Sequence, residues 1–360
     1  MNSSSLYIHI PFCRRKCLFC SFVISVGQER LMDDYAAALV GEMKNYQKKR
    51  INTVYLGGGT PSMLSDNQLG VIMQGLRENY ELKVNAEITI EVNPESIHLS
   101  KARFLKSVGF NRVSLGVQST HDRYLKFLGR AHDAKGAKGA YAVLREAGFT
   151  NINLDLMYAF PGQTQQELED DVNAIARYTS EHLSLYTLTI EPRSRFYTTQ
   201  MKLDDDEKLA GHYLLIARIL EAYGFKQYEV SNFAHPGFES AHNINYWQCG
   251  SYIGLGVGAH GFLEGRRYWN TSHLQTYLQK ALGQTAIEGY EDLSADTIDT
   301  EKLIFGLRMN KGVLWEQVAS SKHKAIGFLI EGGFLVIEDG FLKTTQRGRL
   351  VLDELSSRLV

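Results

Sequence analysis

The chain has 360 residues, of which 44% are hydrophobic and 22% charged, so it has the composition of a globular protein of one large domain or two. Its net charge of -1 excludes a strongly basic protein whose whole surface attracts nucleic acid or anionic lipid. We recognise no signal peptide and no apolar run of the ~18 residues that a transmembrane helix needs, so we expect a cytoplasmic protein.

Short apolar runs in the first half of the chain predict six β-strands, because they are rich in β-branched residues and tyrosine and are bounded by turn residues. Helical stretches separate them, which is typical of parallel βα units, and Ser65, Ser100 and Thr164 stand where helix N-caps are expected. We therefore predict the α/β class and an incomplete (β/α)6 barrel, with its site at the carboxyl ends of the strands. The predicted strands are 6–10, 53–57, 87–92, 112–117, 152–158 and 183–190, and the clearest helices are 29–49, 65–80, 134–147 and 165–178.

The regular alternation ends near residue 225. We predict a barrel domain over 1–225, a connecting region over 226–290 that contains HNINYW and a glycine-rich segment, and a C-terminal domain over 291–360. Helices followed by a hairpin centred on IEDG resemble a winged helix. Basic and acidic residues are nearly balanced there, so a docking or lid role is favoured over DNA binding, and we expect no nucleic-acid partner.

The first chemically unusual stretch is CRRKCLFC, directly after the first predicted strand. Its cysteines, Cys13, Cys17 and Cys20, have the spacing C-x3-C-x2-C and can converge on one metal centre. A structural zinc ion normally needs four protein ligands, so a nearby histidine, such as His9, would have to complete a zinc site. A [4Fe–4S] cluster with three cysteine ligands instead leaves one iron open to a ligand that is not protein. The spacing favours the cluster and leaves a zinc-stabilised binding protein as an alternative.

Two further features lie at the ends of later strands. The segment GGGTP (57–61) lets the backbone approach a ligand closely, although alone it indicates only a tight turn. Polar residues also interrupt or end apolar strands, and buried charges are costly unless they are paired or bound. Each could take part in an internal salt bridge, but together they favour a cavity for a polar ligand. These residues are Glu91, Gln118, Arg130 and Asp155.

With these residues in place, YIHIPFCRRKCLFC resembles the signature of the radical S-adenosylmethionine (SAM) proteins. IEVNPE, SLGVQS, GRAH, DLMYAFPGQT and LSLYTLTIEP resemble successive segments of the HemN/HemW branch, the oxygen-independent coproporphyrinogen III oxidase family, over nearly the whole chain. The resemblance implies a [4Fe–4S] cluster on the three cysteines and SAM on its open iron. It also implies SAM contacts from Tyr7, which would lie beside the cluster, and from Gly58, Gly59, Thr60, Glu91, Gln118, Arg130 and Asp155.

Within this branch the chain resembles the HemW group more than the HemN group. HemN-type dehydrogenases have the pattern CxxxCxxCxC, whereas Ser21 and Phe22 follow Cys20 here, so the fourth cysteine is missing. In addition, only five residues precede the first predicted strand, where HemN proteins carry a longer N-terminal extension. Both departures argue against coproporphyrinogen III dehydrogenation, and whether the chain is an enzyme is left open. The HemW resemblance implies a haem chaperone that binds haem or porphyrin and delivers haem to haem-accepting proteins, with respiratory enzymes as candidates.

The HNINYW motif (242–247) is shared with the HemW group. His242 could supply an axial imidazole to haem iron, or it could be a structural histidine packed on the barrel. Cys249, His235 and His260 are further candidate ligands. The glycine-rich segment 254–262 permits close approach either to a flat ligand or to the cysteine loop. A radical SAM oxidoreductase acting on a porphyrinogen, or a haem-modifying enzyme, is the second functional hypothesis, and the oligomeric state is left open.

Overall fold

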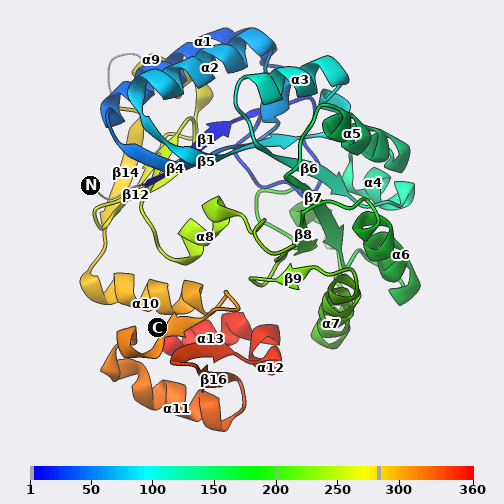
Figure 1. The fold of residues 1–360 in the computed structure, drawn as a ribbon, viewed down its shortest axis with the longest axis vertical. Helices are drawn as coiled ribbons and strands as arrows, with labels where there is room; N and C mark the ends of the chain where they lie inside the picture. The colour runs from blue at the N-terminus through cyan, green and yellow to red at the C-terminus, as the bar shows by residue number, and fades with distance from the viewer. Residues whose placement is uncertain (1–3, 200, 282–284) are drawn as a thin grey trace.

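A curved sheet with helices on its convex side forms most of the molecule (Figure 1). The computed structural model describes residues 4–199, 201–281 and 285–360. Within these ranges the main sheet has twelve strands in the order β14-β13-β12-β11-β1-β4-β5-β6-β7-β8-β10-β9. None of the helices in the described ranges is both long and apolar enough to cross a membrane.

The six predicted strands form the parallel centre of this sheet and confirm the incomplete barrel. They pair in chain order, each parallel to the next. The helices that connect them lie on the convex side in Figure 1, as right-handed βα units require. The strands are β1 (Ser4–Ile10), β4 (Arg50–Gly58), β5 (Glu81–Val92), β6 (Arg112–Gln118), β7 (Ile152–Tyr158) and β8 (His182–Thr187). The helices are α1 (Met32–Met43), α2 (Asp66–Asn79), α3 (Leu99–Ser107), α4 (Asp122–Leu128), α5 (Ala134–Glu146), α6 (Gln165–Ala176) and α7 (Asp206–Ala222).

Residues 226–290 add strands to both edges of the parallel centre. Beyond β8 the sheet continues with β10 (Asn232–Ala234), which pairs antiparallel with β8, and then with β9 (Lys226–Gln227), which pairs antiparallel with β10. At the other edge β11 (Tyr252–Leu255) pairs in parallel with β1, a strand that the sequence pattern did not predict. The sheet then continues with antiparallel strands on either side of α9 (Leu274–Ala281). These are β12 (His260–Leu263), β13 (Arg266–Asn270) and β14 (Ile287–Asp292).

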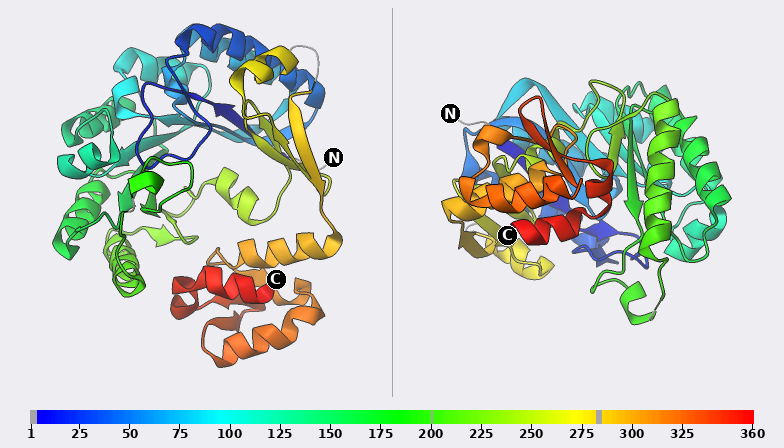
Figure 2. Two further views of the ribbon diagram at one scale, coloured as in Figure 1. Left: turned by 180° about the vertical axis from the view of Figure 1, so that it is seen from behind. Right: turned by 90° about the horizontal axis from the view of Figure 1, so that it is seen from below.

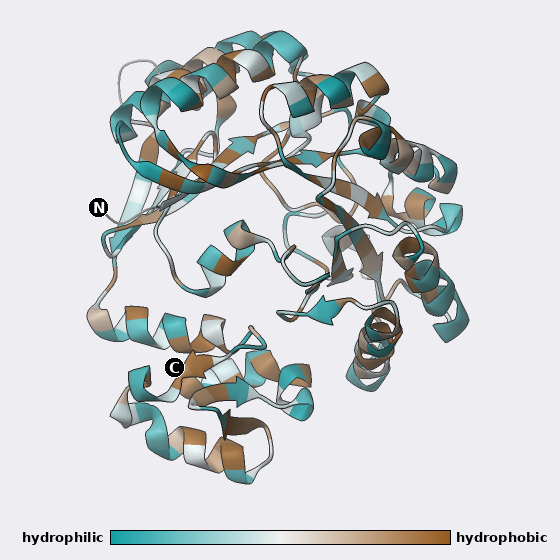
Figure 3. Ribbon diagram, viewed as in Figure 1, coloured by the Kyte–Doolittle hydropathy of each residue, from teal (hydrophilic) through white to brown (hydrophobic). Residues whose placement is uncertain are grey.

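The core lies between the strands and the outer helices, and hydrophobic segments recur along the central strands (brown in Figure 3). One buried carboxylate, Glu42 of α1, ties the added strands to this core. It accepts hydrogen bonds from the backbone of Gly256 (2.8 Å), from the Tyr277 hydroxyl (2.6 Å) and from the Asn270 amide (2.6 Å). Burial raises the pKa of Glu42 to about 7 despite these bonds. The edge beside β1 is therefore fixed by side chains as well as by the sheet.

The C-terminal part has a hydrophobic core of its own. Its three-stranded sheet has the order β15-β17-β16, and its hairpin turns at Asp339 and Gly340, where the IEDG segment predicted it. All views place this part against the open side of the curved sheet (Figures 1 and 2). Its elements are α10 (Ala295–Gly306), β15 (Val313–Leu314), α11 (His323–Glu331), β16 (Leu335–Glu338), β17 (Phe341–Thr344), α12 (Gln346–Leu350) and α13 (Leu352–Leu359).

Specific contacts hold the C-terminal part on the sheet. The Asn310 backbone N–H donates to the Tyr228 carbonyl (2.9 Å), and the Arg308 guanidinium lies 3.5 Å from the buried Glu229 carboxylate. Helix α8 (Ala241–Trp247), which carries HNINYW, lies between the two parts (Figure 1). Its Trp247 ring is covered by the Arg308 guanidinium at 4.4 Å from the ring centroid. The motif therefore sits at the junction of the two parts.

Candidate functional site

The cysteine loop leaves the carboxyl end of β1. Cys13 ends the short strand β2 (Phe12–Cys13), which pairs in parallel with β3 (Ser25–Val26), and the intervening loop carries the other two cysteines. All three thiols are free and only partly buried. The middle of the loop is fixed at Leu18, whose N–H donates to the Leu128 carbonyl (3.0 Å) and whose carbonyl accepts from the Phe196 N–H (3.0 Å). The thiols are thus presented by an anchored loop.

Burial raises the pKa of the Cys13 thiol to about 11 and also raises the pKa of Cys20. Since iron binds thiolates, a bound metal centre must supply the positive charge that stabilises them. The described residues include no group of three or more His, Cys, Asp and Glu that could hold a single metal ion. His9, the residue proposed to complete a zinc site, is buried, and both of its ring nitrogens make hydrogen bonds, to Tyr7 and to the Val23 carbonyl.

The GGGTP segment packs directly on the cysteine loop. The Gly59 N–H donates to the Ile10 carbonyl and the Thr60 N–H to the Phe12 carbonyl, both at 2.8 Å. A Cβ on Gly59 would lie 2.8 Å from the carbonyl oxygens of Pro11 and Phe12. Gly58 has φ +111°, and a Cβ there would meet the His9 ring at 2.4 Å. The glycines are therefore required by close backbone approach, beyond what a simple turn needs.

A chain of hydrogen bonds connects two of the cysteines through the GGGTP segment. The Cys13 thiol lies 3.5 Å from the Thr60 hydroxyl, which accepts from the Asn93 amide at 2.9 Å. The Asn93 carbonyl oxygen accepts from Arg130 Nη2 (2.7 Å), and Arg130 Nη1 donates to the Cys17 sulfur (3.6 Å). Our sequence analysis missed Asn93, although an Asn-Pro pair directly after a buried strand was available as a signal.

Arg130 keeps one donor unused. Its Nη2 also donates to the Gly116 carbonyl (3.1 Å), but its Nε is buried and has no hydrogen-bond partner among the described residues. A buried orphan guanidinium N–H is costly unless a ligand accepts from it, and a carboxylate fits the planar fork best. Gln118, at the end of β6, lies nearby with a left-handed backbone (φ 71°), a conformation that concentrates at binding sites. These residues fit the carboxylate end of an amino-acid ligand.

Two carboxylates lie deeper in the curved sheet. Glu91 accepts from the Gly58 N–H (3.0 Å) and the Tyr55 hydroxyl (2.9 Å), and burial together with Asp155 raises its pKa to about 7. Asp155 accepts from the Asn153 amide (2.7 Å) and the Ser114 hydroxyl (3.2 Å), and burial raises its pKa as well. Neither forms an ion pair with a residue that the structure describes. The internal salt bridge considered for them is therefore absent in the described ranges.

Tyr7 lies beside the segment that follows the cysteines. Its hydroxyl is 3.0 Å from His9 Nδ1, and His9 Nε2 is 2.7 Å from the Val23 carbonyl. Burial raises the pKa of Tyr7 well above its ordinary value. A cavity of about 320 Å³ opens next to it, between the 21–23 segment and strands β11 and β12. The residues that line this cavity, called the tyrosine cavity below, are Tyr7, His9, Ser21, Phe22, Val23, Arg193, Tyr246, Tyr252, Gly258 and His260.

His242 is buried under the tyrosine cavity and does not line it. Its Nδ1 lies 2.8 Å from the Thr53 hydroxyl and its Nε2 lies 3.0 Å from the Tyr246 hydroxyl. Its ring stacks on Tyr55 with centroids 5.1 Å apart, and burial lowers its pKa to about 3. In this arrangement both ring nitrogens are engaged, so neither is open to an iron atom.

The remaining candidates from the sequence fall in different places. The His235 ring stacks on Phe225 with centroids 4.2 Å apart, and Cys249 is a half-buried free thiol; neither lines the tyrosine cavity. Gly258 packs on the cysteine-loop side, because its Cβ would lie 2.9 Å from Val23. At Gly258 the glycine-rich segment therefore approaches the chain that follows the cysteines, one of the two alternatives that the sequence left open.

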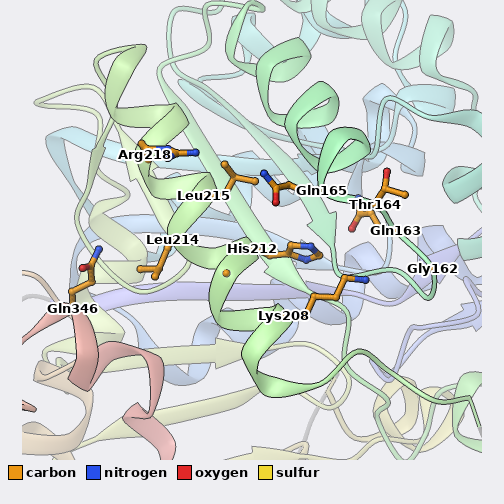
Figure 4. Close-up of a pocket in the computed structure, with 11 residues that line it drawn as sticks. Gly162, Gln163, Thr164, Gln165, Lys208, His212, Leu214, Leu215, Arg218 and Gln346 are labelled. Atoms are coloured by element: carbon orange, nitrogen blue, oxygen red, sulfur yellow. The ribbon is translucent and has the colours of Figure 1, made fainter.

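A larger cavity of about 860 Å³ lies on the outside of the molecule, between α6, α7 and α12 (Figure 4). Lys208, His212 and Arg218 of α7 contribute its basic groups, and Gln346 closes one side (Figure 4). None of the site residues predicted from the sequence lines this cavity. The cysteines, the GGGTP segment and Arg130 lie together elsewhere, at the cysteine loop.

Comparison with known proteins agrees with this geometry. Residues 7–175 match the Radical SAM superfamily, and residues 293–351 match the HemN C-terminal domain. The fold is similar to that of coproporphyrinogen III oxidase (HemN) from Escherichia coli, described as a radical SAM enzyme. The TM-score is 0.87 and the identity 25%, over 99% of this chain and 90% of that one. The fold and the cysteine loop thus define a radical SAM protein, a class that implies a [4Fe–4S] cluster and SAM.

Curated relatives identify the family within this class. The chain is 38% identical to "Heme chaperone HemW" of Lactococcus lactis over 87% of this chain and 84% of that protein. It is 35% identical to the Bacillus subtilis protein of the same name over 98% and 97%. It is 33% identical to the Mycobacterium tuberculosis one over 99% and 94%. The chain belongs to the HemW family.

Proposed function

We propose that this protein is a haem chaperone: it binds haem and passes it to haem-accepting proteins. The observation that carries the proposal is the 33–38% identity to proteins named heme chaperone HemW over nearly their whole length. HemN-type dehydrogenases have the pattern CxxxCxxCxC. Here Ser21 and Phe22 follow Cys20 and the fourth cysteine is missing, which supports the same choice. We further propose that the protein acts in the cytoplasm and that respiratory enzymes are among the acceptors.

The site residues fit the cofactors of the radical SAM class. We propose that Cys13, Cys17 and Cys20 hold the [4Fe–4S] cluster and that the unused Arg130 Nε–H binds the SAM carboxylate. When bound, this pair supplies reductive cleavage of a carbon–sulfur bond. Glu91 and Asp155 would accept hydrogen bonds from the amino or ribose groups of SAM, and the glycine segment would admit its methionine end. The proposed SAM contacts are Tyr7, Gly58, Gly59, Thr60, Glu91, Gln118, Arg130 and Asp155.

The three parts of the chain suggest a division of labour. We propose that 1–225 holds the cofactors, that 226–290 contributes to the haem site, and that 291–360 docks against the open side of the sheet. The HNINYW helix supports this view because Tyr246 faces the tyrosine cavity while Trp247 packs under Arg308 of the C-terminal part.

A radical SAM oxidoreductase acting on a porphyrinogen is the second candidate, favoured by the TM-score of 0.87 to HemN. One experiment separates the two. The anaerobically reconstituted protein is incubated with reductant, SAM and coproporphyrinogen III, and in parallel is titrated with haem. Stable haem binding without decarboxylation supports the chaperone. Decarboxylated product overturns it.

A further inference from the structure

The tyrosine cavity contains a histidine whose ring is free to bind metal. His260 lies at the start of β12 and is exposed, and neither of its ring nitrogens hydrogen-bonds to a residue that the structure describes. Its ring contact is with Trp269, at a centroid distance of 6.1 Å. Partial burial of its ring and the nearby Arg267 lower its pKa, so the imidazole is neutral at neutral pH and keeps a lone pair. This sets His260 apart from the engaged rings of His9 and His242.

The rest of the cavity suits a flat, apolar, anionic ligand. Aromatic side chains surround it: Tyr7, Tyr246 and Tyr252 line the wall, and the Phe22 side chain, 64% exposed, stands on the rim. A large exposed aromatic side chain beside a cavity is typical of a surface that covers a ligand face. Its volume of about 320 Å³ is at the lower end for ligand sites, so a macrocycle would stay partly exposed. Partial exposure suits a ligand that is transferred to another protein.

The tyrosine cavity also has a positively charged side chain. Arg193 lines the cavity, and its guanidinium forms no ion pair or side-chain hydrogen bond within the described ranges. The Arg193 backbone carbonyl accepts from the Lys16 ammonium at 3.0 Å, which holds this segment beside the cysteine loop. An unpaired guanidinium at the mouth of an aromatic cavity can bind a carboxylate in a bidentate manner.

From this arrangement we propose that His260 binds the haem iron in the tyrosine cavity, with Arg193 pairing with a propionate. This inference rests on the proposed function, because the ligand is haem only if the protein carries haem. The motif histidine then has a different role: His242 is a positioning residue, whose Nε2 holds the Tyr246 hydroxyl at 3.0 Å and so fixes one wall of the cavity.

The test is haem titration of the full, anaerobically reconstituted chain, followed by visible absorption. His260→Ala should lower haem affinity about tenfold or more and abolish the spectrum of imidazole-ligated haem. Because His260 is exposed, this variant should fold, and added free imidazole should restore the spectrum. His273→Ala is the matched control, because His273 is an exposed histidine that does not line the tyrosine cavity, and this variant should bind haem as wild type does. His242→Gln should keep the imidazole-ligated spectrum.

Three results would overturn the assignment. They are an unchanged haem spectrum in His260→Ala, loss of the imidazole-ligated spectrum in folded His242→Gln, and an equal loss of that spectrum in the control His273→Ala. Wild-type protein that binds no haem would instead overturn the proposed function, so the two failures are distinguishable. Arg193→Ala should weaken binding of haem but leave binding of haem dimethyl ester unchanged, since the ester has no carboxylate. Equal weakening of both would refute the propionate contact.

Discussion

Arg130 Nη1 donates to the sulfur of Cys17 at 3.6 Å, while Nε of the same guanidinium is buried without a partner. The two residues are 113 positions apart in the chain and come together where the loop after α4 meets the cysteine loop. One side chain thus faces a metal ligand and offers a free donor beside it. This relationship supports the proposal that Arg130 binds the SAM carboxylate beside the cysteine loop.

Arg130→Lys should lower SAM affinity by tenfold to a hundredfold, because a charge-assisted hydrogen bond contributes roughly 1.5–3 kcal/mol and lysine lacks the planar fork. Iron content should stay at the wild-type level, since the three thiols are unchanged. Calorimetric titration with SAM and iron analysis measure the two quantities. Arg103→Lys is the control, because Arg103 is 62% exposed and pairs with Glu146 away from the site. Unchanged SAM affinity in Arg130→Lys would contradict the assignment.

Gly59→Ala should disrupt the packing of the GGGTP segment against the cysteine loop. The added Cβ would lie 2.8 Å from two backbone carbonyl oxygens, and backbone cannot yield as a flexible side chain can. We expect a loss of roughly 1–3 kcal/mol in unfolding free energy and poor cluster incorporation. Gly70→Ala in α2 is the matched control, because nothing lies within 4 Å of its Cβ. Equal behaviour of the two variants in denaturant titration would show that the close approach is unimportant.

Glu91 makes stability depend on pH in a defined direction. Its pKa in the folded chain is about 7 against an ordinary 4.5, so folding favours the protonated form. The stability that this group contributes is complete below pH 4.5 and is lost as pH rises through 7. From pH 5 to pH 8 wild type should lose stability relative to Glu91→Gln, by at most about 3 kcal/mol. Denaturant titrations of both proteins at the two pH values measure it, and parallel curves would contradict the prediction.

Cys17→Ser tests whether the cofactor and haem sites are separate. The substitution removes one of three thiolates, so cluster iron should be lost. The tyrosine cavity contains no cysteine, so haem should still bind with the imidazole-ligated spectrum. Iron analysis and haem titration of the same preparation provide both readings, and circular dichroism checks that the chain is folded. Loss of haem binding in a folded variant would show that the two sites are coupled.

The sequence predicted the parts of the fold that local patterns determine. The six parallel strands are confirmed, and Ser65 and Thr164 cap α2 and α6 as their positions before helical runs indicate. The prediction that Ser100 caps α3 was wrong. His98 accepts from the Lys101 N–H and caps this helix, and histidine is not one of the residues that usually indicate an N-cap. Strand β11 was also missed, because it pairs with β1 from far along the chain and its glycines weaken a strand pattern.

The site was predictable where residues are chemically unusual for their position. Charged and amide residues within buried strands drew attention to Glu91 and Asp155, and the structure places both on the inner side of the sheet. Asn93 escaped because its importance lies in bridging Thr60 and Arg130, which depends on three separate segments meeting. The sequence could not show that both His242 ring nitrogens are occupied, because His242 lies on α8 and its partner Thr53 on β4, far away in the chain.

Transfer of haem to an apoprotein is the direct test of a haem chaperone. The reconstituted full-length protein is loaded with haem, separated from free haem and mixed with apomyoglobin, and the visible spectrum is followed over time. We expect haem to leave the protein and the spectrum of the acceptor's haem complex to appear. Haem that stays bound throughout, together with SAM-dependent decarboxylation of coproporphyrinogen III by the same preparation, would contradict it.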